Sequence, residues 1–230
     1  MKLLTINSIE TSSICDNKCD YCPAKEQHKY RDTGYMSMDV FRKALEWVEW
    51  CARRGTQQEL NLFGVGEPTL NPNIVQMCRL GRHILPDSRE LHFNTNGNTM
   101  TEELALDLKS AGITHIDVTL HVGYAKNPKN VSKVIQILNE HGMMRPGGIS
   151  VDPIIRPNNW AGQVDWPDSG IRFQCPFLTK GQVMIMSNGD ITTCCIDAFG
   201  RGIVGNVFDS KPEDIDLKPF DLCETCHSKI

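Results

Sequence analysis

The most informative stretch of the chain is Cys15-Asp16-Asn17-Lys18-Cys19-Asp20-Tyr21-Cys22, which follows a strand-like alternation at residues 3–11. Three thiols at these spacings, with no fourth cysteine nearby, suit an iron–sulfur cluster with one open iron, because structural clusters usually have four cysteine ligands. An open coordination position is what a catalytic metal site needs. The alternative for this stretch is a zinc knuckle with His28 as its fourth ligand.

A second motif, Gly64-Val65-Gly66-Glu67-Pro68, follows the predicted strand at residues 59–63. Alone it is a common glycine turn before a helix. Combined with CxxxCxxC and with the aromatic Tyr21 before the third cysteine, it closely resembles the signature of radical S-adenosyl-L-methionine (radical SAM) enzymes.

The resemblance implies a [4Fe–4S] cluster on Cys15, Cys19 and Cys22 whose open iron binds S-adenosyl-L-methionine. In that family one electron cleaves this cofactor to a 5′-deoxyadenosyl radical, which abstracts hydrogen from a substrate. The binding site for the cofactor would then include Tyr21, Gly64, Gly66, Glu67 and Pro68, with Glu67 and backbone groups holding the methionine ammonium. The departure from the family's Gly-Gly-Glu-Pro is Val65, which need not interfere because backbone groups make the contact.

Strand-like and helical segments alternate through the first two thirds of the chain. We expect strands at 3–11, 59–63, 91–94, 115–120 and 149–155, and helices at about 37–54, 71–85, 101–111 and 130–141. Ser37, Asn71 and Thr101 are expected to cap helix N-termini. This alternation predicts an α/β fold of right-handed parallel βα units, and the resemblance implies a partial (β/α) barrel of about five to six parallel strands. Because only five strands can be counted, the sixth is missing or lies in the C-terminal region.

Polar residues close three of the predicted strands. Asn94 and Asn96 lie in a stretch that resembles the family's Thr-Asn-Gly, which contacts substrate or ribose. Thr119 and His121 share one face by the two-residue period and match a position that reaches the cofactor's ribose or carboxylate, unless they only satisfy their own backbone. Arg156 either binds a carboxylate bidentately or is an exposed linker residue.

The C-terminal part of the chain carries a second set of cysteines. Residues 157–172 are interpreted as a linker between a core at 1–156 and a small domain at 173–230. Within that domain Asn188-Gly189 predicts a β-hairpin with a type I′ turn.

Cys175, Gly189, Cys194 and Cys223-Glu-Thr-Cys226 closely resemble the abbreviated "twitch" version of the SPASM auxiliary-cluster domain. The resemblance implies a second [4Fe–4S] cluster held by Cys175, Cys194, Cys223 and Cys226. Three alternatives remain: a four-cysteine zinc ribbon, Cys195 in place of Cys194, and a c-type haem attachment site at the CxxCH that ends with His227. The last of these would need export.

The composition is that of an ordinary globular protein, with 40% hydrophobic and 23% charged residues and a formal net charge of −4. No run of five basic residues offers a broad nucleic-acid footprint, although a nucleotide substrate remains open. The sequence contains neither a bilayer-spanning apolar stretch nor a secretory signal at its start, so we expect a cytoplasmic protein without membrane association. Ten cysteines in a reducing compartment favour metal binding over disulfides, with Cys51 and Cys78 expected as buried core residues.

Four cysteine ligands on the second cluster would leave no iron free for substrate, so its remaining use is electron transfer. That favours a dehydrogenase like the twitch-containing enzymes that oxidise a secondary alcohol in aminocyclitol biosynthesis. The alternatives are a redox-neutral isomerase acting on a modified nucleotide, DNA base or amino-acid adduct, a peptide-modifying maturase, and a non-enzymatic zinc or iron–sulfur binding module. Maturases generally carry a leader-peptide-binding domain, for which we expect no room before the first strand. Implied partners are a small-molecule, nucleotide or peptide substrate and a one-electron reductant such as flavodoxin or ferredoxin.

Overall fold

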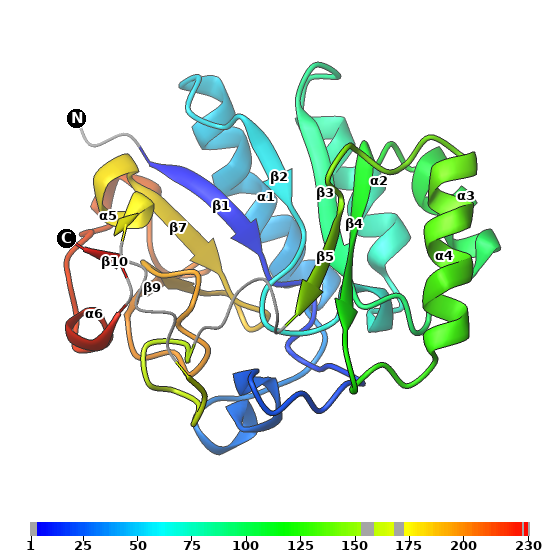
Figure 1. Ribbon diagram of the computed structural model, residues 1–230. Helices are drawn as coiled ribbons and strands as arrows, with labels where there is room; N and C mark the ends of the chain where they lie inside the picture. The colour runs from blue at the N-terminus through cyan, green and yellow to red at the C-terminus, as the bar shows by residue number, and fades with distance from the viewer. Residues whose placement is uncertain (1–3, 153–158, 168–172, 227, 230) are drawn as a thin grey trace.

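The computed structural model describes residues 4–152, 159–167, 173–226 and 228–229 (Figure 1). Its main element is an eight-stranded sheet in the order β5-β4-β3-β2-β1-β7-β8-β9. The strands are β1 (Thr5–Ile9), β2 (Glu59–Asn61), β3 (Glu90–Thr95), β4 (His115–His121), β5 (Ile149–Asp152), β7 (Gln182–Ile185), β8 (Asp190–Thr192) and β9 (Ile203–Asn206). Strands β6 (Phe173–Gln174) and β10 (Ser228–Lys229) form a separate parallel pair.

The first six strands of the sheet, from β5 to β7, are all parallel. They therefore share one carboxyl edge, at the bottom of Figure 1, where the segment between β1 and α1 lies. The fold is α/β with a mostly parallel sheet, consistent with a radical SAM partial barrel and with the predicted number of parallel strands.

The sixth parallel strand that the sequence pattern left unassigned is β7. It pairs with β1, with Ile9 opposite Ile185, so the β-hairpin predicted for the C-terminal domain extends the core sheet. Strands β8 and β9 then follow antiparallel. The boundaries predicted at residues 156 and 172 fall at or beside residues outside the described ranges, and that division stays a prediction.

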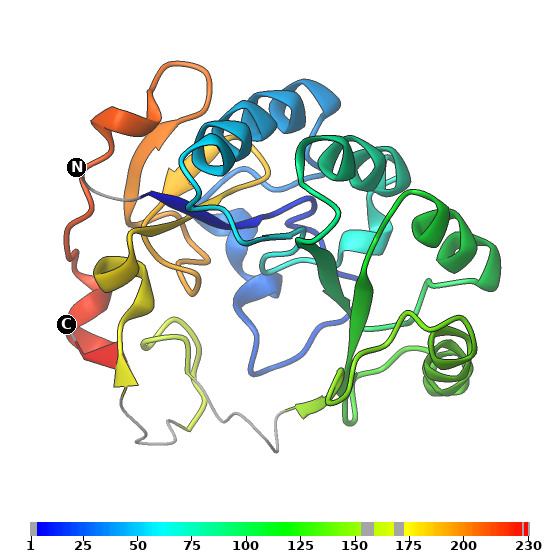
Figure 2. The same cartoon turned by 90° about the horizontal axis from the view of Figure 1, so that it is seen from above.

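Four long helices lie along one face of the curved sheet (Figure 2): α1 (Met38–Arg53), α2 (Ile74–Ile84), α3 (Glu102–Ser110) and α4 (Pro128–Glu140). Short helices α5 (Pro176–Lys180) and α6 (Leu222–Thr225) and 3-10 turns η1 (Pro23–Lys25), η2 (Gln27–Lys29), η3 (Pro68–Leu70) and η4 (Pro212–Asp214) complete the fold. Buried apolar side chains of the strands pack against those of the helices in one core, which includes Phe41, Met77 and Phe93. Burial of this apolar area is the main stabilising contribution. Cys51 and Cys78 lie in this core, as predicted.

Two predicted helix caps are confirmed and one is wrong. The side chains of Ser37 and Thr101 accept hydrogen bonds from the backbone N–H groups three residues later. Helix α2, by contrast, begins at Ile74, with Asn73 at its N-cap position. The Asn71 side-chain oxygen accepts from the Asn73 N–H (2.9 Å) in the turn before the helix, while its amide nitrogen donates to the carbonyl oxygens of Thr11 (2.7 Å) and Met36 (3.1 Å). Asn71 therefore fastens the chain on both sides of the cysteine loop.

The turn between β7 and β8 also differs from the prediction. A type I′ turn needs positive φ at both central residues, and of the pair only Gly189 has it, at +91°. Met186 donates to the carbonyl of Asp190 (2.7 Å) and accepts from Gly189 (2.9 Å), as in a three-residue loop with a left-handed glycine. The Asn188 side chain accepts from the Asp190 N–H (3.1 Å), which stabilises this longer turn.

Within the described ranges, no helix has the length and apolar character that crossing a bilayer requires.

Candidate active site

The cysteine motif lies on the long loop between β1 and α1, at the carboxyl edge of the sheet (Figure 1). The loop is closed at its base by Ser13 and Gly34, whose backbone and side-chain groups exchange hydrogen bonds of 2.8–3.1 Å. Cys19 is buried, Cys15 and Cys22 are half-buried, and the Cys22 N–H donates to the Cys19 carbonyl at 3.2 Å. The loop therefore keeps all three thiols at least partly buried at this edge of the sheet.

Burial disfavours the thiolate form of the three cysteines in this loop. Burial raises the pKa of the Cys15 and Cys22 thiols to about 12 each, and it raises the pKa of Cys19 as well. The carboxylates of Glu67 and Asp16 raise the pKa of Cys15 further. These sulfurs can ligate as thiolates only where a cation offsets the cost of burying their charge.

The arrangement of the sulfurs bears on the choice between an iron–sulfur cluster and a single zinc ion. Zinc–sulfur bonds of about 2.3 Å would bring the ligands of one ion close together. Among the described residues, no three cysteine sulfurs lie within 4.8 Å of one another, and His28, exposed on η2, joins no such group. The ligand role of Cys15, Cys19 and Cys22, in a cluster or in a zinc knuckle, therefore stays a prediction of the sequence.

The Gly64–Pro68 loop packs tightly against the segment that leads into the cysteine motif. A Cβ at Gly66 would lie 2.2 Å from the carbonyl oxygen of Ser12, and one at Gly64 would lie 2.7 Å from the Glu10 side chain. The Glu67 N–H donates to the Ile14 carbonyl at 2.8 Å. The two glycines are therefore required for the close approach of the two loops, whatever else they contact.

Glu67 and Asn96 join three strand ends into one network. The buried Glu67 carboxylate accepts from the Thr95 hydroxyl (2.8 Å), the Asn96 N–H (2.7 Å) and the Thr69 hydroxyl (2.6 Å). Burial raises the pKa of Glu67, whereas these hydrogen bonds lower it. The Asn96 amide in turn lies 3.7 Å from the Cys15 sulfur and donates to Asp16 at 2.7 Å. The cysteine loop, the Gly64–Pro68 loop and the end of β3 are thereby held in fixed relative positions.

Several aromatic side chains surround Tyr21. Its hydroxyl lies 2.6 Å from Nδ1 of His121 at the end of β4, and its ring contacts those of Tyr124 and Trp166 at centroid distances of 5.4 and 5.5 Å. The Trp160 indole N–H donates to the Tyr21 carbonyl at 3.0 Å. Burial lowers the pKa of His121, so its imidazole is neutral at physiological pH.

The remaining predicted pocket residues differ in their placement. Thr119 accepts a hydrogen bond from the Ser150 hydroxyl at 3.0 Å, so it is engaged within the sheet. Half-buried Asn94 lies opposite Asp117 and hence on the same face of the sheet as His121. Arg156 lies outside the described residues.

Sequence reasoning missed Asp152, which closes β5 directly beside the end of β4. It is the strand partner of His121, and its Oδ1 is buried without a hydrogen-bond partner. Because buried oxygens are normally satisfied, this one is available to a bound molecule. It lies within the strand predicted at 149–155, two residues after Ser150, so the two-residue period that grouped Thr119 with His121 also groups Ser150 with Asp152.

Sequence reasoning also missed the buried pair of Glu10 and Arg31. The Arg31 guanidinium donates bidentately to the Glu10 carboxylate at 2.7 and 2.8 Å. The Arg31 side chain is 6% exposed and the Glu10 side chain is 0% exposed. Glu10 also accepts from the N–H groups of Val65 (3.3 Å) and Ser187 (3.1 Å). This carboxylate therefore connects β1, the Gly64–Pro68 loop and the turn after β7.

The four C-terminal cysteines predicted to form a set line one small cavity, together with Leu178, Thr193 and Leu222: Cys175, Cys194, Cys223 and Cys226. Cys195 does not line this cavity and is exposed, which favours Cys194 as the member of the set. Burial strongly raises the pKa of Cys194. Segments 48 residues apart, from Cys175 to Cys223, are thus brought together, although their ligand role stays a prediction.

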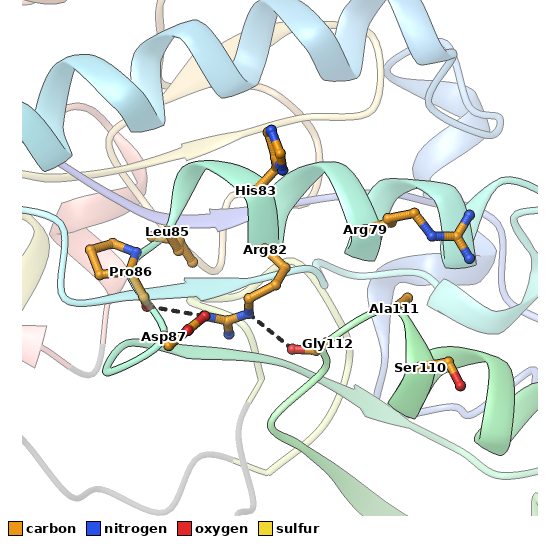
Figure 3. A pocket seen from close by; sticks show the side chains of 9 residues that line it. All are labelled: Arg79, Arg82, His83, Leu85, Pro86, Asp87, Ser110, Ala111 and Gly112. Carbon is orange, nitrogen blue, oxygen red and sulfur yellow. Dashed lines mark hydrogen bonds between the residues drawn. The ribbon is translucent and has the colours of Figure 1, made fainter.

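A larger hollow of about 520 Å³ lies outside the sheet, between the ends of α2 and α3 (Figure 3). Arg82, which points into it, donates to the carbonyl oxygens of Pro86, Arg89 and Gly112, each at 3.0 Å. Its charge is used to hold loops together, and no predicted site residue lines this hollow.

Among curated proteins, two relatives match parts of the chain. The "Tungsten-containing aldehyde ferredoxin oxidoreductase cofactor-modifying protein" of Pyrococcus furiosus is 25% identical over 166 residues, which are 66% of this chain and 44% of that protein. The "S-adenosyl-L-methionine-dependent 2-deoxy-scyllo-inosamine dehydrogenase" of Niallia circulans is 28% identical over 122 residues, 53% of this chain and 47% of that protein. The aligned regions thus span about half the length of these relatives.

Solved structures share the fold. The structure of BtrN in complex with AdoMet and 2-DOIA superposes with a TM-score of 0.71 at 19% identity, covering 93% of this chain and 81% of that one. The structure of anSMEcpe with bound AdoMet gives a TM-score of 0.59 at 14% identity, covering 97% and 86%. The model of the radical SAM superfamily matches residues 9–159, which run from the last residue of β1 through the cysteine loop and strands β2 to β5. The chain therefore belongs to the radical SAM superfamily.

Proposed function

We propose that this radical SAM enzyme oxidises a small-molecule substrate, in the manner of a dehydrogenase. The observation that carries the proposal is the convergence, at one edge of the sheet, of the three-thiol loop, the Gly64–Pro68 loop and Asn96, with Asn96 contacting both. When bound by Cys15, Cys19 and Cys22, a [4Fe–4S] cluster supplies the electron that cleaves S-adenosyl-L-methionine to a 5′-deoxyadenosyl radical.

The chain's own residues would bind and orient the cofactor and substrate. The Gly64–Pro68 backbone runs beside the cysteine loop and would hold the methionine part of the cofactor there. Tyr21 and the neutral imidazole of His121 form an aromatic wall at the end of β4. Such a wall offers stacking surface and hydrogen-bonding groups, which are the elements of a small-molecule site.

Asp152 is our candidate for the group that accepts the substrate's proton. Oxidation of a secondary alcohol to a ketone removes one hydrogen atom from carbon, one proton from oxygen and one further electron. The bound cofactor would supply the radical that takes the hydrogen atom, and the buried, unpartnered oxygen of Asp152 would accept the proton. The electron needs an acceptor close to this pocket.

A second [4Fe–4S] cluster on Cys175, Cys194, Cys223 and Cys226, in a twitch-like C-terminal region, would supply that acceptor. The shared cavity of these four side chains supports this assignment. The two cysteine sets are also connected: Trp160 packs in one apolar cluster that includes Cys22 and in another that includes Cys194 and Cys226. The Niallia circulans relative is named as a dehydrogenase that depends on S-adenosyl-L-methionine, which further supports this choice of reaction.

Cofactor cleavage tests the first half of the proposal. Protein reconstituted anaerobically with iron and sulfide, then given dithionite and S-adenosyl-L-methionine, should form 5′-deoxyadenosine and contain about eight irons per chain. Cys19→Ala should form none and contain about four irons. Cys78→Ala is the matched control, because this thiol lies in the core and should leave both measurements unchanged. Cleavage that persists in Cys19→Ala would remove the assignment of the cysteine loop.

A further inference from the structure

A second group of ligand-type side chains lies at the opposite end of the strands from the cysteine loop. Glu59, Glu90 and His115 are the first residues of β2, β3 and β4, and His92 lies two residues after Glu90. The strand register places Glu59 opposite Glu90 and His92 opposite His115. All four therefore project from one face of three adjacent strands.

That face is the one turned away from the helices. Leu91, Phe93 and Ile116, which alternate with the two histidines, are buried in the core that packs against the helices. The histidines consequently point to the inner side of the curved sheet, close to its amino edge. The loop that carries Cys15, Cys19 and Cys22 lies at the other end of these strands, at the carboxyl edge of the sheet.

The two imidazoles are buried, and three of their four ring nitrogens lack a hydrogen-bond partner. His92 is 5% exposed and His115 is 4% exposed. Neither ring nitrogen of His92 has a hydrogen-bond partner, nor has Nε2 of His115. Buried polar groups left in this state destabilise a protein, so a native structure normally supplies a partner.

The geometry of these groups suits a single metal ion. One ligand atom from each of Glu90, His92 and His115 lies within 4.8 Å of the other two. The imidazole rings are stacked with their centroids 4.5 Å apart and their planes at 19°. A carboxylate oxygen of Glu59 lies 3.6 Å from Nε2 of His92, beside this group. Ligand bonds to zinc of about 2.0–2.2 Å would need only small side-chain adjustments from this arrangement.

The charges around the group favour a cation as well. Glu59 and Glu90 are like charges on directly opposed residues, an unfavourable arrangement without compensation. The neighbouring Arg145 is bound to Asp117 at 2.6 and 3.1 Å, so its charge is already shared.

We propose that Glu90, His92 and His115 bind a divalent transition-metal ion of the zinc class, with Glu59 next to it as a fourth carboxylate ligand or as a hydrogen-bonding neighbour. Two imidazoles with one or two carboxylates form a ligand set that suits zinc. The ion would join the first residues of three strands and satisfy the buried nitrogens. It is a site separate from both cysteine sets and from the proposed radical chemistry.

Zinc binding by the reconstituted holoenzyme tests this proposal, because loaded clusters occupy the cysteine ligands. We expect wild-type protein to retain about one zinc per chain after gel filtration, with nitrogen and oxygen ligands and no sulfur in its X-ray absorption spectrum. His115→Gln and Glu90→Gln should each weaken zinc affinity, measured by competition with a chelator, by about 10–100-fold or more. His83→Gln, which changes an exposed histidine on α2, is the matched control and should bind like wild type.

Folding of each variant is checked by circular dichroism. Because Glu90 is exposed at the start of its strand, Glu90→Gln should fold even if His115→Gln does not. Wild-type protein that retains no zinc would overturn the proposal. So would sulfur ligation, or equal zinc affinity of wild type and a folded Glu90→Gln.

Discussion

Removing Arg31 should destabilise the protein far more than removing an arginine from an exposed ion pair. Arg31→Leu leaves the Glu10 carboxylate buried, with only the N–H groups of Val65 and Ser187 as donors. It also removes the donor to the Ala198 carbonyl, which Arg31 Nε contacts at 2.8 Å. Breaking a buried pair in this way costs about 3–5 kcal/mol. That is a large share of the roughly 5–15 kcal/mol by which folded domains are stable.

The assay is urea unfolding followed by circular dichroism under anaerobic conditions, with the free energy of unfolding taken from linear extrapolation. Arg42→Leu is the matched control, because its ion pair with Asp39 spans a similar 3.0 Å while the side chains are 55% and 88% exposed. That variant should lose less than about 1 kcal/mol.

A double variant, Glu10→Met with Arg31→Leu, separates the buried charge from simple loss of packing. Because it removes the unpaired carboxylate, it should be more stable than Arg31→Leu alone, a positive coupling between the two positions. The reasoning would be refuted if Arg31→Leu cost no more than Arg42→Leu, or if the double variant were the sum of its two single changes.

Two further predictions concern the reaction. A folded Cys223→Ala variant should still form 5′-deoxyadenosine but no product, because the substrate's electron then has no acceptor. Liquid chromatography with mass spectrometry measures both compounds. Product from a folded variant that lacks the second cluster would instead favour a redox-neutral isomerase. Asp152→Asn should keep cofactor cleavage within a few-fold of wild type while lowering the rate of product formation by about 10²–10⁴-fold, the usual contribution of a positioned base. An Asp152→Asn variant with a wild-type product rate would remove Asp152 from the reaction.

The features that the sequence predicted correctly depend on local chain geometry. The spacing of Cys15, Cys19 and Cys22 sets the reach of the thiols, whatever the rest of the fold does. Ser37 and Thr101 cap their helices through backbone groups only three residues away. The alternation of strands and helices through residue 152 likewise follows from the spacing of apolar residues over short stretches of the chain.

The features that it could not predict depend on which distant segments become neighbours. The sequence pattern of Gln182–Ile185 would be the same in a separate hairpin as in a strand of the core sheet. Its pairing with β1 makes it the sixth parallel strand. Asn71 looks like a helix cap until the carbonyls of Thr11 and Met36 are placed beside it.

Strand register decided the rest. The sequence by itself determined the superfamily signature, the helices and most of the strands, because these follow from local propensity and covalent spacing. Only the tertiary structure placed Asp152 beside His121, Glu10 against Arg31 and His92 against His115. Register arises from packing between segments far apart in the chain, and a shift of one residue in any strand would point these side chains to the other face of the sheet.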